Sequence, residues 1–182
     1  MDLVQWAEAE GRRRLGTIRS RWLHCQAAGR RATEIAAVVD RSDQSVLVAA
    51  ALLHDIGYAP ELDVSGFHPL DGARWLDGQG HRRLAGLVAH HTGARFEGEA
   101  LGLAAAVARF IDERSPVSDA LTYCDLTTGP AGQRTTVERR LREIEARYGA
   151  ASVVVRALEH ASPSLFAMVE RTEQRLAAAS VR

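Results

Sequence analysis

Apolar residues recur at helical spacing along nearly the whole chain, and no alternating run of β-branched residues is long enough to predict a strand. The pattern therefore predicts an all-α fold. Residues 46–53 are apolar on all faces, so the helix that they form should lie at the centre of a bundle and end at Gly57. The other expected helices are a short one beginning at Leu3, one from Thr17 or Ser20 to about Val39, segments 69–77, 81–91, 101–111, 117–126 and 136–148, and two final helices separated at Ser162 and Pro163.

The length of 182 residues is typical of one domain, and neither an internal repeat nor a linker divides the chain. We therefore expect residues 1–182 to form a single domain. Apolar residues make up 46% of the chain and charged residues 25%, which is ordinary for a globular protein with a sizeable core. The 15 Gly and 5 Pro residues are too few for extensive disorder.

The charges of the chain balance, because 23 basic residues, all of them Arg, accompany 23 acidic residues. A net charge of zero disfavours nonspecific binding to nucleic acid or to an anionic membrane. The N-terminus lacks the apolar core of a signal peptide, and the longest apolar runs have eight residues, too few to span a bilayer. Cys25 and Cys124 provide no disulfide framework. We expect a cytoplasmic protein without a membrane or nucleic-acid partner.

The first chemical signal is the pair His54-Asp55 at the end of the most apolar helix. Polar groups in an apolar interior need a compensating partner, and a metal ion is one such partner. Side chains of adjacent helical residues point about 100° apart, so both can reach one cation only where the helix ends, as it does at Gly57. His24 and Asp125 lie on other helices that could converge on the same ion. Nitrogen and oxygen ligands of this kind suit Fe, Mn, Ni, Co or Zn.

The order of these residues and the string Leu53-His54-Asp55-Ile56-Gly57 resemble the HD superfamily of metal-dependent phosphohydrolases, and within it the HDIG-type subgroup. The resemblance covers about residues 20–130, which leaves the helices of residues 133–182 as an extension. It implies a single HD-type helical bundle with the metal site between helices. Three further features are similar to HD-type dinucleoside polyphosphate hydrolases: Arg21 three residues before His24, His68 before a Gly-Ala pair, and the string His90-His91-Thr92-Gly93.

The resemblance implies two divalent transition metals per chain, with Fe or Mn favoured and Co, Ni or Zn open. Asp55 would bridge the two metals. The apolar stripe of the preceding helix points His91 toward the core, whereas the family's double-His pattern generally puts the first His on the metal; we favour His90 as ligand and His91 beside it. The implied ligands are His24, His54, Asp55 and Asp125 for the first metal, and Asp55, His68 and His90 or His91 for the second.

The implied activity is hydrolysis of a phosphoester or phosphoanhydride bond by a hydroxide that bridges the metals. The substrate would be a small phosphorylated metabolite, with nucleotides and dinucleoside polyphosphates favoured. Arg21 could bind a phosphate oxygen, and Arg74 and Arg134 are weaker candidates that fit solvated surface charges better. Tyr58 stands where relatives with the His-Asp-Ile-Gly-Lys string carry Lys, which disfavours the cyclic dinucleotide phosphodiesterases. We expect Asp55, Arg21, His91 and Tyr58 to act in catalysis.

Two alternatives remain open from the sequence. Some HD-fold proteins use a mixed-valent di-iron pair to activate dioxygen, and the same His/Asp ligands support that chemistry. The third interpretation is a ligand-sensing protein that holds metal without turnover. His81 and His160 lie among polar residues, so we expect them at the surface and outside any metal site. The sequence does not indicate the oligomeric state, and the helix of residues 136–148 leaves a homodimer open.

Overall fold

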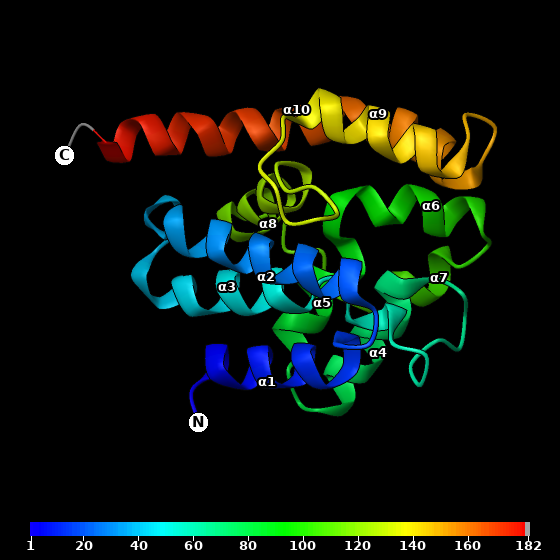
Figure 1. Cartoon of the computed structure of the whole chain (residues 1–182), viewed down its shortest axis with the longest axis horizontal. Helices are drawn as coiled ribbons and strands as arrows, with labels where there is room; N and C mark the ends of the chain where they lie inside the picture. The colour runs from blue at the N-terminus through cyan, green and yellow to red at the C-terminus, as the bar shows by residue number, and fades with distance from the viewer. Residues whose placement is uncertain (181–182) are drawn as a thin grey trace.

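Helices make up most of the computed structural model, which describes residues 1–180 (Figure 1). The predicted all-α fold is confirmed: in these residues the only β-type pairing is one isolated bridge between Thr128 and Arg134. The α-helices are α1 (Leu3–Leu15), α2 (Arg19–Glu34), α3 (Gln44–Leu53), α4 (His68–Gly78), α5 (Arg82–His90), α6 (Ala94–Ala100), α7 (Ala104–Val107), α8 (Pro116–Leu126), α9 (Val137–Tyr148) and α10 (Val153–Ser180). Short 3₁₀ helices, η1 (Ala36–Val38), η2 (Arg41–Asp43), η3 (Ile56–Tyr58) and η4 (His91–Gly93), connect several of them.

The central helix of the bundle is α3, as its uniformly apolar sequence predicts. It packs against α1, α2, α5 and α8, and Leu47 and Leu53 are completely buried. The main core extends from Ala7 in α1 to Val169 in α10. Because α3 is enclosed on all sides, the residues that follow its last turn begin inside the protein rather than at its surface.

The last two helices form a layer of their own along one side of the bundle, opposite α1 (Figure 1). Helix α10 packs on α8 and α6, and α9 packs on α10 and α8. Ionic contacts support this arrangement, since the buried carboxylate of Asp119 in α8 accepts hydrogen bonds from Arg171 at 2.6 and 2.9 Å and from Arg175 at 2.8 Å, both in α10.

Two helix predictions are wrong. The expected helix over residues 101–111 is absent, because α6 ends before the left-handed Gly102 (φ 73°) and only the short α7 follows. The expected break at Pro163 is also absent, since α10 continues through it for 28 residues. The apolar face of α10, which includes Ala161 and Leu165, stays buried across the proline and offsets the lost backbone hydrogen bond.

Two helix lengths also differ from the prediction. Helix α1 is longer than expected and continues to Leu15, with Asp2 and Gln5 forming a capping box at its start. Helix α2 ends at Glu34, five residues before the expected end, and η1 replaces its last turn. Within residues 1–180, no helix combines the length and the hydropathy that crossing a bilayer requires.

Candidate metal centre

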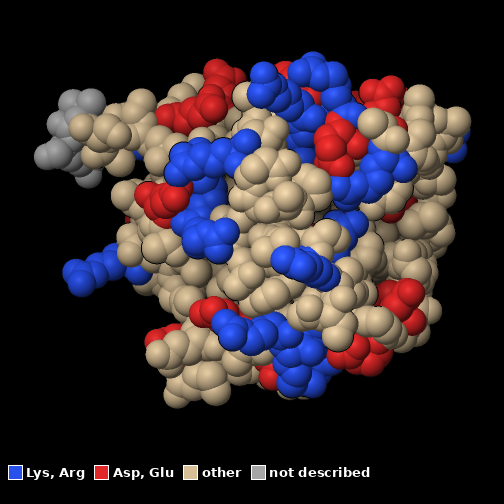
Figure 2. Space-filling view, in the orientation of Figure 1, with Lys and Arg blue, Asp and Glu red and all other residues tan. Residues whose placement is uncertain are grey.

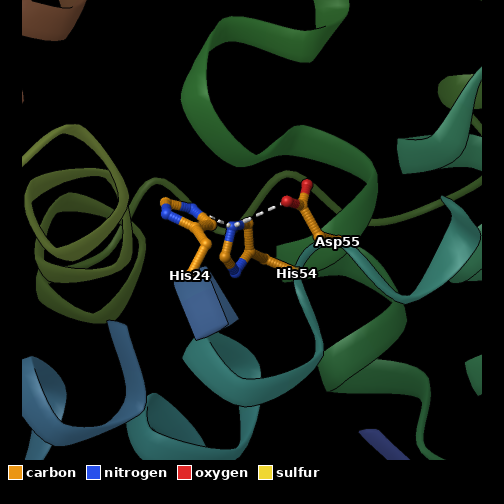
Figure 3. A group of neighbouring side chains, drawn as sticks. All are labelled: His24, His54 and Asp55. Carbon is orange, nitrogen blue, oxygen red and sulfur yellow. Dashed lines mark hydrogen bonds and ion pairs between the residues drawn. The ribbon is translucent and has the colours of Figure 1, made fainter. Parts of the chain in front are cut away.

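Three buried side chains from two neighbouring segments meet at the end of α3 (Figure 3). His24 comes from the middle of α2, His54 follows the last residue of α3, and Asp55 precedes η3. The Nε2 atoms of His24 and His54 lie 3.1 Å apart, and His54 Nε2 lies 3.7 Å from Asp55 Oδ2. The structure therefore brings together the His, His-Asp set that the sequence predicted, with all three residues almost fully buried.

A second group shares Asp55 with the first. His68, the first residue of α4, has its Nε2 atom 3.3 Å from Asp55 Oδ1 and 3.4 Å from the Nε2 atom of His91. His91 begins η4, directly after α5. Each group offers three ligand atoms within 4.8 Å of one another, the spacing that one metal ion requires. The two groups share the carboxylate of Asp55, so each could hold a metal ion with Asp55 between them.

The protein backbone fixes which nitrogen of each imidazole faces this centre. The Nδ1 atoms of His54 and His91 lie 2.9 Å from the Ala51 carbonyl oxygen and 2.7 Å from the Val88 carbonyl oxygen. A carbonyl only accepts, so Nδ1 carries the proton and Nε2 presents its lone pair to the cluster. Burial lowers the pKa of both imidazoles, which keeps them neutral. The Nε2 atom of His54 faces His24 and that of His91 faces His68, and such neutral imidazole nitrogens are donors that a metal ion satisfies.

Two carboxylates supply the negative charge of the centre. Burial raises the pKa of Asp55, but His54, Arg21 and a hydrogen bond from His68 outweigh it and hold that pKa well below its usual value. The pKa of Asp125, near the end of α8, is also held well below its usual value. Burial raises this pKa, but the hydrogen bond with His24 and the charge of Arg140 lower it by more. Asp125 Oδ1 lies 3.0 Å from His24 Nε2. Both carboxylates are therefore ionised and adjacent to the histidines, which fits the binding of divalent cations.

Gly57 explains how Asp55 and His68 come so close. A Cβ atom at Gly57 would lie 2.0 Å from the His68 carbonyl oxygen and 2.7 Å from the Gly72 nitrogen. Only glycine therefore lets η3 approach the first turn of α4 at this distance. Pro69 suits the start of that helix, because its missing N–H needs no partner there.

A strained turn connects His91 to Asp125. Thr92 adopts a left-handed conformation (φ 47°), which is rare for a β-branched residue, and Gly93 follows with φ 75°. The Thr92 hydroxyl donates a hydrogen bond of 2.5 Å to Asp125 Oδ2. The turn thus ends α5 next to His91, and the hydrogen bond from Thr92 orients the Asp125 carboxylate.

The centre opens into a cavity of about 250 Å³ that is lined by Asp55, His68, His91 and Asp125. Arg21 and Tyr58 line it as well. The Arg21 guanidinium donates to Asp55 Oδ2 at 3.0 Å and lies 3.8 Å from the Tyr58 ring centre. Tyr58 stacks on His68, and burial and the nearby Asp55 charge raise the pKa of its hydroxyl, which stays protonated. Arg21 and Tyr58 therefore lie directly beside Asp55 and His68.

The choice of His90 as a ligand is corrected by the structure. Its Nε2 atom lies 2.9 Å from the Phe110 carbonyl oxygen, away from the cluster, and His91 takes the expected position. His91 continues the buried side of α5 that Leu84, Leu87 and Val88 form, whereas His90, the last residue of the helix, is turned toward Phe110. His160 is exposed as expected, whereas His81 is half-buried against the Trp6 ring.

Arg74 and Arg134 take no part in the cavity. Arg74 pairs with Asp71 at 3.4 Å, and the exposed Arg134 pairs with Glu34 at 2.6 Å. Sequence reasoning missed residues that do line the cavity: Glu97, Arg140, Arg147 and Tyr148. Arg140 and Arg147 belong to one amphipathic helix that carries other, exposed arginines. Their separation of seven residues, about two helical turns, is the sequence feature that places them on a common face. Burial raises the pKa of Glu97, which the sequence did not indicate.

Comparison with known proteins gives one match. Residues 21–117, just over half of the chain, match the family described as HD domain. No curated protein and no solved structure matches the chain. The matched region contains five of the clustered residues, from His24 to His91, and the structure brings all five together around Asp55. On the match and the geometry together, the chain belongs to the HD domain family.

Proposed function

We propose that this protein is a metal-dependent phosphohydrolase that cleaves a phosphoester or phosphoanhydride bond of a small metabolite, with nucleotides as the first class to test. The observation that carries the proposal is the convergence of neutral Nε2 atoms and ionised carboxylates on two positions that share Asp55. Family membership supports it, since HD domains are typical of such hydrolases.

The ligand types favour transition metals. One position would be held by His24, His54 and Asp55, with Asp125 beside it, and the other by Asp55, His68 and His91. Imidazole and carboxylate ligands together suit Fe, Mn, Co, Ni or Zn better than Mg or Ca. When bound, two divalent cations would supply positive charge that acidifies water and withdraws electrons from a phosphoryl group.

The remaining residues of the cavity fit the handling of a phosphorylated substrate. One guanidinium nitrogen of Arg21 donates to Asp55, and another donates to the Tyr148 hydroxyl at 3.1 Å. A guanidinium has five N–H groups, so others can donate to a phosphate oxygen. The protonated Tyr58 hydroxyl can donate a hydrogen bond. The cavity of about 250 Å³ lies just below the roughly 300–1,000 Å³ of sites for drug-sized ligands, so a fully enclosed dinucleoside polyphosphate would not fit inside it.

The test is phosphate release by protein loaded with Mn, or with Fe under anaerobic conditions. The panel contains nucleotides, dinucleoside polyphosphates and simple phosphomonoesters, with wild type compared with Asp55→Asn. We expect the variant to lose activity about 100-fold or more, because Asp55 belongs to both metal positions and even indirect changes at metal sites cost about 10- to 100-fold. His160→Gln, on the exposed face of α10, is the control and should match wild type. Equal activity of wild type and Asp55→Asn, or no release from any substrate, would overturn the proposal.

A further inference from the structure

Helix α9 presents one face to the cavity. Arg140, Ile144 and Arg147 follow one another at steps of four and three residues, which puts them on the same side of a helix, and all three line the cavity. Only 5% of the Arg140 side chain is exposed, whereas Arg147 keeps 33% of its side chain accessible. In Figure 2 basic side chains gather over the region of α9, with acidic ones among them. Helix α9 lies entirely outside the region that matches the HD domain family.

Three guanidinium groups meet at this edge of the cavity. Arg21 of α2 joins Arg140 and Arg147, since the same three side chains line both the cavity and a smaller hollow beside His24. Like charges at close range repel, so such a group is stable only with compensating anions. A cluster of arginines is also the usual recognition element for phosphate, because the planar guanidinium matches its oxygens.

The acidic partners of these arginines are too few once metals are bound. In residues 1–180, the ion pairs of the three arginines use Asp55, Asp125 and Glu143. The first two carboxylates belong to the metal centre. Glu143 alone then faces three positive charges, which leaves an excess of two. The Nε atom of the buried Arg140 also has no hydrogen-bond partner.

We propose that Arg140 and Arg147, together with Arg21, form a binding site for a phosphate dianion, so that the substrates are phosphomonoesters rather than phosphodiesters. The inference rests on the proposed hydrolase function and narrows its substrate class. A terminal phosphate carries about two negative charges at neutral pH and a diester carries one, so the dianion neutralises more of this positive charge. Ile144, Val154 and Leu158 line the same cavity and provide apolar contacts for the organic part of the substrate.

The test measures binding of inorganic phosphate to the metal-loaded full-length protein by calorimetry at about pH 8, with dimethyl phosphate as the monoanionic probe. We expect Arg147→Gln to weaken phosphate binding by about tenfold or more, as loss of one charge-assisted hydrogen bond should. Arg142→Gln, on the exposed side of the same helix, is the matched control and should bind phosphate as wild type does. Dimethyl phosphate should bind wild type at least tenfold more weakly than phosphate. Phosphate binding by Arg147→Gln equal to wild type, or equal binding of the two probes, would overturn the inference.

A second variant separates ligand binding from a structural role. Arg147 pairs with Glu143, so a purely structural ion pair predicts the same effect from Arg147→Gln and Glu143→Gln. The anion site predicts opposite effects, because Glu143→Gln removes the acid that competes with phosphate and should tighten binding severalfold. Weakened binding in both variants would contradict the inference.

Failure of the hydrolase proposal gives a different result. If Arg147→Gln loses phosphate binding while wild type hydrolyses nothing, the anion site stands and the catalytic proposal falls. If wild type hydrolyses substrates while Arg147→Gln binds phosphate normally, the catalytic proposal stands and the anion site falls.

Discussion

At the scale of single residues, the centre depends on hydrogen bonds that orient imidazole rings. His54 and His91 each follow the last turn of a helix, and each donates Nδ1–H to the carbonyl oxygen three residues earlier, Ala51 or Val88. The helix end therefore provides the acceptor that fixes the tautomer. This repeated arrangement places two Nε2 lone pairs at the centre without any further side chain.

The adjacent histidines His90 and His91 allow a matched test of this account. We expect His91→Ala to reduce the metal content of the protein by about one ion per chain, because it removes a ligand of the second group. His90→Ala should retain wild-type metal content and lose about 1 kcal/mol of stability with its contact to Phe110. Elemental analysis and urea unfolding measure both quantities. Metal loss in His90→Ala, with full content in His91→Ala, would refute the assignment.

The residues of the centre could largely be predicted from the sequence. The apolar segment before His54 and the positions of the other polar residues indicated His24, His54 and Asp55, the family resemblance added His68, and the structure brings these four together. The choice of His90 is wrong because it followed the family's double-His pattern, whereas the apolar stripe of α5 points to His91. The final position of His91 also depends on the residue at which α5 ends and on the left-handed turn at Thr92. These are properties of the folded backbone, and no residue type in this string determines them.

At the scale of elements, the contact between η3 and α4 determines the distance between Asp55 and His68. Gly57 permits this contact, since any Cβ there would meet the backbone of α4. The sequence predicted Gly57 only as the end of a helix. Its second role follows from tertiary packing, which a single sequence does not indicate.

Gly57→Ala should therefore damage both stability and metal binding. We expect a loss of about 3 kcal/mol in the free energy of unfolding, the upper range for overpacking, because the clash is with backbone atoms that cannot rotate away. Gly78→Ala is the control: it lies in α4 with open space around its Cβ position and should be neutral or stabilise by about 0.5–1 kcal/mol. Urea unfolding and metal content of both variants provide the test. A Gly57→Ala protein as stable and as metal-rich as wild type would show that the close approach is dispensable.

Helices α8 and α9 could be predicted well, whereas the helix over residues 101–111 and the continuous course of α10 could not. Segments 117–126 and 136–148 agree with α8 and α9 because Pro116 and Thr136 give clear start signals. The apolar residues after Leu101 predicted a helix although Gly102 ends one there. Pro163 predicted a break, but α10 continues through it because its apolar face is buried. Local signals thus failed where packing against the rest of the bundle decides the outcome.

At the scale of the whole molecule, two layers complete one site. The region that matches the HD domain family supplies five clustered residues, and the helices after it supply Asp125, Arg140 and Arg147. The ion pairs of Asp119 with Arg171 and Arg175 fasten α10 to α8, and α9 packs on both helices. The C-terminal layer is therefore part of the cavity wall, which explains why reasoning from the family resemblance alone missed its arginines.

The central claim is that the cluster around Asp55 holds metal, and metal content per chain tests it most directly. Protein purified anaerobically, stripped with a chelator and reloaded with Mn or Fe is measured by elemental analysis, beside Asp55→Asn treated in the same way. The account predicts about two ions per chain in wild type, as in two-metal sites, and essentially none in Asp55→Asn. A wild-type protein that takes up no metal, or an Asp55→Asn protein that retains two ions, would contradict it.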